Sequence, residues 1–302
     1  MKLKSAEAPA LRKPRAPRGR VLRHLMTDRA AAAAAAFLLV LALVALFAPW
    51  IATHDPDRQN LALQLQGPSG DHWLGTDNFG RDLFSRLVSS TRVTLLAVLE
   101  ALVLASVLGV PLGLLAGYAG GAVDAVLSRV SDAILALPPL ILAIAIVGIL
   151  GPGLTNAMLA LGIVLAPPQF RLARGAAQSV SSETYIEACR SLGCSPWRIL
   201  WRHVLPNAGS PLLVQISFAA GVIVIAEASL SFLGLGVQAP QSSWGTLLRD
   251  AFDHIYDSPY SLAAPTVMVA LTILSFSTLG DALRDALEGQ GGGRSRSDQE
   301  KS

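Results

Sequence analysis

The sequence has little charge and little of the chemistry that soluble enzymes use. Only 15% of its 302 residues are Asp, Glu, Lys or Arg, against about 25% in a typical soluble domain. Its five histidines are scattered, and it has no phosphate-binding Gly-Lys-Ser/Thr loop and no His–acid cluster within an apolar run. We therefore expect no catalytic residue, no cofactor and no metal site in this chain.

Cysteine is scarce too. Cys189 and Cys194 lie five residues apart, a spacing that matches neither a zinc nor a redox motif. We place them in a cytoplasmic segment, where a disulfide is not expected, and interpret them as small packing residues. The net charge of +3 comes mainly from the N-terminal tail. It indicates membrane topology and no nucleic-acid partner.

What the sequence does have is long apolar runs. Hydrophobic residues make up 52% of the chain, with a mean hydropathy of +0.49. About 20 apolar residues span a bilayer as a helix, and these runs lack the alternation of barrel strands. The sequence therefore predicts an all-α polytopic membrane protein. The runs without Asp, Glu, Lys or Arg are Ala30–Ile51, Ala101–Val123, Ala133–Gln169, Val204–Ala226 and Ser258–Gly280.

We expect six transmembrane helices, so both termini lie on one side. The tail 1–29 carries nine Lys/Arg, and the positive-inside rule makes that side cytoplasmic. The acidic stretch 51–80 then lies outside and the Arg-rich stretch 171–206 inside, as their charges require. The expected spans are residues 30–51, 90–117, 126–150, 154–171, 207–235 and 259–281.

The chain divides into four predicted parts. Residues 1–29 form a disordered basic cytoplasmic tail, and residues 30–86 hold the first span, longer than a signal-peptide core, with an extracytoplasmic segment. Residues 87–285 form the transmembrane core. Residues 286–302 form a second disordered cytoplasmic tail.

The most informative stretch is residues 183–207, which we call the elbow. Thr184 and Glu187 have capping-box spacing, which predicts the start of a short helix. Gly193 can adopt the left-handed conformation that ends it. Ser195 followed by Pro196 is a typical start for a second helix.

The second helix of the elbow should have an apolar face, carrying Trp197, Leu200, Trp201 and Val204, and should end at Pro206. A compact helical elbow with one apolar side is suited to docking into a groove of another protein. The alternative is a rigid loop on the membrane surface.

The elbow resembles the EAA loop of ABC importer permeases, the coupling helix that sits in a cleft of the cytoplasmic ATPase subunit. Cys189 stands where that family usually has a second alanine, and it keeps the position small. The matching residues are Glu187, Ala188, Cys189, Gly193, His203, Leu205, Pro206 and Asn207.

Other segments resemble the dipeptide, oligopeptide and nickel branch of the same family. They are the turn Gly113–Asp124, the stretch Ala226–Gly245, the last inside turn Gly280–Asp285 and an outer segment before the second span. The outer side chains either form a local ion-pair lattice or contact a binding protein. The outer residues are Gly75, Thr76, Asp77, Gly80, Arg81 and Asp82.

The resemblance covers residues 30–288 and implies a type I ABC importer permease fold in the inner membrane. It also implies the partners: a second homologous permease (a heterodimer), two ATP-binding subunits that hold ATP and Mg, and an extracytoplasmic solute-binding protein. Peptides are the expected cargo. The alternatives are nickel or another small solute, an ion-coupled secondary transporter and an intramembrane enzyme.

Two acids lie within apolar stretches. Glu100 interrupts the second span, and Glu227 lies near the outer end of the fifth. An acid within a membrane is a functional candidate, so both are candidates for the pathway or for packing. For Glu100 we expect an orientation toward the bundle or the partner permease, the alternative being that the helix starts late. For Glu227 the alternative is a structural hydrogen bond to the adjacent helix.

Overall fold

The computed structural model describes residues 27–288, and within them every regular element is a helix apart from one isolated bridge between Thr76 and Asp82. The predicted tails 1–29 and 286–302 lie almost wholly outside the described residues. The elements are α2 (Arg29–Ile51), η1 (Leu61–Leu63), α3 (Leu83–Ala119), α4 (Gly121–Leu135), α5 (Pro139–Leu150), α6 (Leu154–Val164), α7 (Ala166–Ser181), α8 (Thr184–Ser191), α9 (Pro196–Ile199), η2 (Leu200–Val204), α10 (Leu205–Phe232), α11 (Trp244–Asp253), η3 (Pro259–Leu262) and α12 (Ala263–Glu288).

The long apolar runs form long helices, as predicted. Helix α2 covers the expected first span and is capped by Asp28, whose Oδ1 accepts from the Ala30 amide at 2.9 Å. Helix α3 starts earlier than expected, at Leu83, because Asp82 caps it by accepting from the Ser85 amide. Helix α12 continues to Glu288, beyond the predicted end of the last span.

The fold is held together by a close contact between α3 and α7. Gly109, Gly113 and Gly117 lie four residues apart, so they share one face of α3. A Cβ atom at these positions would lie 2.5 Å from the Ala166 carbonyl oxygen and 2.3 Å from those of Phe170 and Arg174, respectively. Only glycine allows the two backbones to approach this closely, as in small-residue contacts between membrane helices.

The predicted third span, 126–150, is not one straight helix. Helices α4 and α5 meet at a bend of 92°. The break falls at residues 136–138, where Pro139 begins α5 and proline disfavours helical geometry in the residue before it. The bend is much sharper than a kink within one continuous helix.

The predicted fourth span, 154–171, is also divided. Helix α6 ends at Val164, Leu165 leaves helical geometry, and α7 begins with Ala166 followed by two prolines. Prolines fit the first turn of a new helix because their missing N–H groups would have no partner there. Within residues 27–288, four helices are long and apolar enough to span a membrane, or up to five if α4 and α5 count as one. The expected six are therefore not found as six continuous helices.

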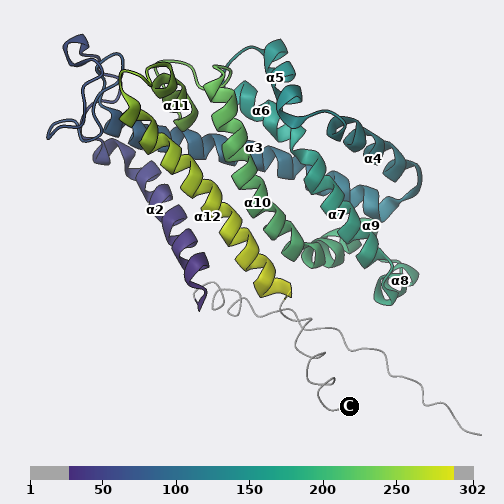
Figure 1. The fold of residues 1–302 in the computed structure, drawn as a ribbon. Helices are drawn as coiled ribbons and strands as arrows, with labels where there is room; N and C mark the ends of the chain where they lie inside the picture. The colour runs from purple at the N-terminus through teal and green to yellow at the C-terminus, as the bar shows by residue number, and fades with distance from the viewer. Residues whose placement is uncertain (1–26, 289–302) are drawn as a thin grey trace, which may run out of the picture.

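Helices α2, α12 and α10 run side by side, and α3 crosses behind them (Figure 1). The start of α2 and the end of α12 lie at the same end of the molecule, and the 51–82 connection lies at the other. The amide of Gly153, in the α5–α6 turn, donates to the Leu235 carbonyl beyond α10, so these two connections are neighbours. One hydrophobic cluster joins α3, α5, α6 and α10, and a second lies beneath the elbow.

Candidate functional sites

The elbow reverses direction at a Schellman motif. Gly193 has φ +77°, its amide donates to the Arg190 carbonyl at 3.0 Å, and the Cys194 amide donates to the Cys189 carbonyl at 3.0 Å. These two bonds define the motif. An apolar contact between the residues joined by the longer bond, Cys189 and Cys194, completes it. Cys189 and Cys194 are free thiols, and partial burial raises the pKa of Cys189. The predicted packing role of the cysteines and the turn at Gly193 are confirmed.

The capping box predicted at Thr184 is wrong. Glu183 has extended backbone geometry and occupies the N-cap, without a side-chain cap, and Thr184 is the first helical residue. Helix α7 ends at Ser181, so Glu183 has to turn the chain. Ser195 does cap the second helix, accepting from the Arg198 amide at 3.4 Å, with Pro196 in the first turn.

Pro206 does not end the elbow as predicted. Helix α9 passes through a π-helical stretch, Leu200–Val204, directly into α10. The Leu205 amide donates to the carbonyl five residues back, at Leu200. A wider turn here offers relief from the clash that Pro206 would otherwise make with the carbonyl four residues earlier. The second half of the elbow is therefore continuous with the long helix α10.

The base of the elbow is buried. Ile186, Ile199, Leu200 and Val204 pack with residues of α3, α7 and α10. The outer side is exposed: Leu192 at the tip is 84% exposed, Trp197 68% and Trp201 50%. The predicted apolar face is therefore divided, since Leu200 and Val204 point inward while the two tryptophans lie against each other in an edge contact at the surface.

A hydrogen-bonded brace joins the two ends of the elbow. The Asn207 side-chain amide donates to the Tyr185 hydroxyl at 3.2 Å and to the His203 carbonyl at 2.7 Å. The guanidinium carbon of Arg190 lies 5.0 Å from the centroid of the Tyr118 ring, which links α8 to the end of α3. Of the predicted elbow residues, Glu187, Ala188, Gly193, Pro206 and Asn207 are exposed, and Cys189, His203 and Leu205 are half-buried. Tyr185 was not among them.

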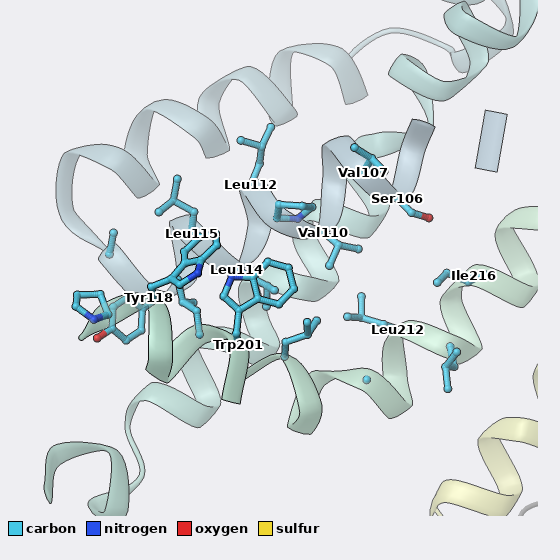
Figure 2. A pocket seen from close by; sticks show the side chains of 18 of the residues that line it. Ser106, Val107, Val110, Leu112, Leu114, Leu115, Tyr118, Trp201, Leu212 and Ile216 are labelled. Carbon is cyan, nitrogen blue, oxygen red and sulfur yellow. The ribbon is translucent and has the colours of Figure 1, made fainter. Parts of the chain in front are cut away.

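An apolar groove of about 1210 Å³ opens between the C-terminal half of α3 and the elbow (Figure 2). Figure 2 shows Leu112, Leu115 and Tyr118 on one side of it and Trp201 and Leu212 on the other. Ser106, Tyr118 and Ser195 are the polar residues among its lining side chains. Such a surface can bury apolar groups of a neighbouring chain or of lipid.

On the opposite end of the molecule, the predicted outer residues form a buried ion-pair network. Arg81 Nε lies 2.7 Å from Asp77 Oδ2, and Arg86 pairs with the same oxygen. Arg86 also reaches Asp250 of α11 at 3.3 Å. Burial raises the pKa of Asp250, although Arg86 and Arg81 act against this. These charges join the outer segment to α11. The network is not the local lattice predicted among the outer side chains, because Asp82 pairs with His72 and Arg86 reaches Asp250, 164 residues away.

Asp82 and the glycines complete the outer segment. Asp82 is buried, and its carboxylate accepts from the Ser85 amide at 2.8 Å and contacts His72 Nδ1 at 2.9 Å. Burial opposes ionisation of Asp82, but hydrogen bonds from Ser85 and His72 outweigh it and lower its pKa. Gly75 and Gly80 have φ of +79° and +68°, and a Cβ atom on either would meet the backbone of Gln66 or Asn60. Thr76 hydrogen-bonds the Gln66 amide at 2.9 Å.

The two membrane acids have different surroundings. Glu100 lies in the middle of α3 and is half-buried, so the alternative of a late helix start is wrong. Glu227 is fully buried and accepts from Ser231 Oγ at 2.8 Å, within its own helix. Nearby, Trp244 begins α11 and is anchored to α3, its amide donating to Thr94 Oγ1 at 3.1 Å and its indole N–H to Thr91 Oγ1 at 3.3 Å.

The fold and these sites define a multi-helical membrane protein of the transporter-permease class. Residues 109–290 match the family of binding-protein-dependent transport system inner membrane components. Residues 17–68 match the N-terminal transmembrane domain of oligopeptide transport permease C. The chain therefore belongs to the binding-protein-dependent transport system inner membrane component family. It is an inner-membrane permease of an ABC importer, a class that lacks an ATPase site of its own.

Individual relatives are also permeases of transport systems. The chain is 40% identical to the probable D,D-dipeptide transport system permease protein DdpC of Escherichia coli K12, over 86% of this chain and 87% of that one. It is 42% identical to the dipeptide transport system permease protein DppC of Alkalihalophilus pseudofirmus, over 82% and 81%. An inward-facing structure of the MetNI methionine ABC transporter covers 68% of this chain and 97% of its own, with a TM-score of 0.56 and 21% identity. That likeness supports the fold.

Proposed function

We propose that this permease carries short peptides across the inner membrane and is driven by ATP-binding subunits that dock on the elbow. The substrate class is supported by the names of the relatives, which include permeases for D,D-dipeptides, dipeptides, di- and tripeptides and glutathione. All of these are short peptides. They favour a peptide over nickel or another small solute.

The elbow is the observation that carries the proposed coupling. Its tip is exposed while its base is buried against α3, α7 and α10, and its second half is continuous with α10. A push on the tip would therefore move a long helix as a rigid body, which is how packed elements transmit large changes. Glu187 and Ala188 lie on the exposed side and would contact the ATP-binding subunit.

The complete importer would contain two ATP-binding subunits, which hold ATP and Mg, an extracytoplasmic solute-binding protein, and a second homologous permease as partner in a heterodimer. The chain would cross the membrane six times, with both termini cytoplasmic, and α4–α5 and α6–α7 would each form one divided crossing. Glu100, on α3 beside the exposed Leu99 and Val103, would face the second permease. The outer segment Gly75–Asp82 would shape the surface that meets the binding protein.

Substitution of Gly193 tests the coupling role. The position has open space around it but a positive φ, so Gly193→Val adds about 1–3 kcal/mol of local strain without a clash. We expect normal membrane insertion, poor co-purification of the ATP-binding subunits and loss of uptake. Gly193→Asn is the matched control, because asparagine tolerates this conformation, and it should retain most uptake. Uptake of Gly193→Val at the level of Gly193→Asn would contradict the proposal.

The substrate class has its own test. Uptake of a labelled dipeptide by cells expressing the complete importer should be competed by unlabelled di- and tripeptides and unaffected by Ni²⁺. Competition by Ni²⁺ alone would overturn the peptide assignment while leaving the ATP-driven permease intact.

A further inference from the structure

Three potential metal ligands, distant in the sequence, meet at the outer end of the first helix. His54 follows α2, His72 lies in the connection to α3, and Asp82 caps α3. His72 Nδ1 lies 2.9 Å from Asp82 Oδ1, and His54 Nδ1 lies 3.9 Å from Asp82 Oδ2. The two imidazole rings are 4.8 Å apart between centroids. One ligand atom from each residue lies within 4.8 Å of the other two.

These separations are close to what a transition metal requires. Ligand atoms at about 2.0–2.2 Å from a tetrahedral Zn²⁺ are roughly 3.3–3.6 Å from one another. The distance from His72 to Asp82 Oδ1 is 2.9 Å and that from His54 to Asp82 Oδ2 is 3.9 Å. These values lie on either side of the required separation, and small side-chain rotations would bring both imidazoles to one cation held by the carboxylate. Two imidazoles and one carboxylate form a donor set that favours zinc-type cations over Mg²⁺ or Ca²⁺, which take oxygen ligands.

The surroundings hold the ligands and leave room for entry. The Ser85 amide donates to Asp82 Oδ2 at 2.8 Å, and Ser85 Oγ accepts from the His54 amide at 3.0 Å. Hydrogen bonds of this kind, made to the ligating residues themselves, orient metal ligands. The side chain of Asp82 is 1% exposed and that of His72 14%, but that of His54 is 42% exposed. A cavity of about 440 Å³ is lined by His54 together with Asp55 and Arg92, whose opposite charges offset each other. This cavity can hold a water molecule as a further metal ligand.

We propose that His54, His72 and Asp82 form a binding site for a divalent cation of the zinc type. A bound cation would join the end of α2 directly to the start of α3, beyond the contacts that the hydrogen bonds at Ser85 provide. The proposal is independent of the transported substrate. It departs from the sequence-based expectation of no metal site, because His54 and His72 belong to separate stretches of the extracytoplasmic connection and share no recognisable spacing.

The test is zinc stoichiometry in the purified complete importer after dialysis against Zn²⁺ and removal of free metal. His54→Gln is the main variant, since His54 is the most exposed ligand and its loss should leave the Ser85 and Asp82 cap intact. His254→Gln is the matched control, because His254 ends α11 on the same side and contacts the Asp250 carbonyl at 3.0 Å. We expect His54→Gln and His72→Gln to bind one Zn²⁺ fewer per copy of this chain than wild type and His254→Gln.

A thermal shift provides the second readout. Added Zn²⁺ should raise the unfolding temperature of the wild type and of His254→Gln, as any ligand of the native state does. It should have no such effect on His54→Gln, and equal Mg²⁺ should affect none of them. Equal zinc content and an equal thermal shift in wild type and His54→Gln would overturn the site and leave only a hydrogen-bonded cluster.

Discussion

Asn207 shows how one side chain can hold two parts of the elbow together. It donates both to the Tyr185 hydroxyl of α8 and to the His203 carbonyl. Asn207→Ala removes both bonds, each worth about 0.5–1.5 kcal/mol, so α8 should open locally more often. We expect faster hydrogen exchange of the amides of 184–191, with unchanged exchange in α3.

The control is Asn156→Ala, which removes two equivalent bonds to the carbonyls of Leu150 and Gly151 at the opposite end of the molecule. It should loosen the α5–α6 turn and leave α8 unaffected. Unchanged exchange of α8 in Asn207→Ala would show that the brace contributes nothing to the rigidity of the elbow.

The buried arginines of the outer network should be worth far more than surface ones. Arg86→Met leaves the buried Asp77 with Arg81 as its remaining charged partner, and breaking a buried ion pair typically costs about 3–5 kcal/mol. We therefore expect a clear fall in the unfolding temperature of the purified complex. Arg249→Met, which breaks an exposed pair with Asp253 at 3.9 Å, should cost less than about 1 kcal/mol. Similar losses in the two variants would contradict the burial argument.

At the scale of the helices, the contact between α3 and α7 depends on glycine. In Gly113→Ala the new methyl group would lie 2.3 Å from the Phe170 carbonyl oxygen and 2.9 Å from the Ala173 Cβ, so the helices must separate. We expect a cost of about 1–3 kcal/mol, seen as a lower unfolding temperature. Gly148→Ala in α5 has open space and should be neutral or stabilising by up to about 1 kcal/mol. A neutral Gly113→Ala would contradict the close packing.

The long helices and the elbow were predictable because their signals are local. Charge-free runs placed α2, α3, α10 and α12, and Gly193 with Ser195-Pro196 placed the turn of the elbow. The 92° bend between α4 and α5 was less predictable, because two prolines indicate a kink but not its angle. The glycines at 109, 113 and 117 carried a recognisable spacing that the sequence analysis did not use.

The functional sites were less predictable, because their partners are distant in the chain. Asp77 and Arg81 are neighbours, but their link to Asp250 of α11 requires the folded structure. The hydrophobic pattern of the elbow predicted one apolar face, whereas packing against α7 and α10 divides it. Which apolar side chains are buried depends on what covers them, and that information is not in the local sequence.

For the molecule as a whole, the proposed sidedness can be tested by thiol labelling in intact cells. With Cys189 and Cys194 replaced by serine, Asp57→Cys should react with a membrane-impermeant reagent and Ser182→Cys should react only after the membrane is opened. Both positions are exposed, so a difference in labelling reports sidedness and not burial. Labelling of Ser182→Cys alone would invert the topology.

The central claim, that ATP-binding subunits dock on the elbow, is tested most directly by cross-linking from its tip. Leu192 is 84% exposed, and Leu192→Cys in the same cysteine-free background should form a short-range cross-link to an ATP-binding subunit in assembled, transport-competent complexes. Tyr256→Cys, 99% exposed at the outer end, is the control and should form none. Cross-linking from Leu192→Cys to the ATP-binding subunit is the result that the account predicts. Its absence from complexes that contain those subunits and transport normally would contradict it.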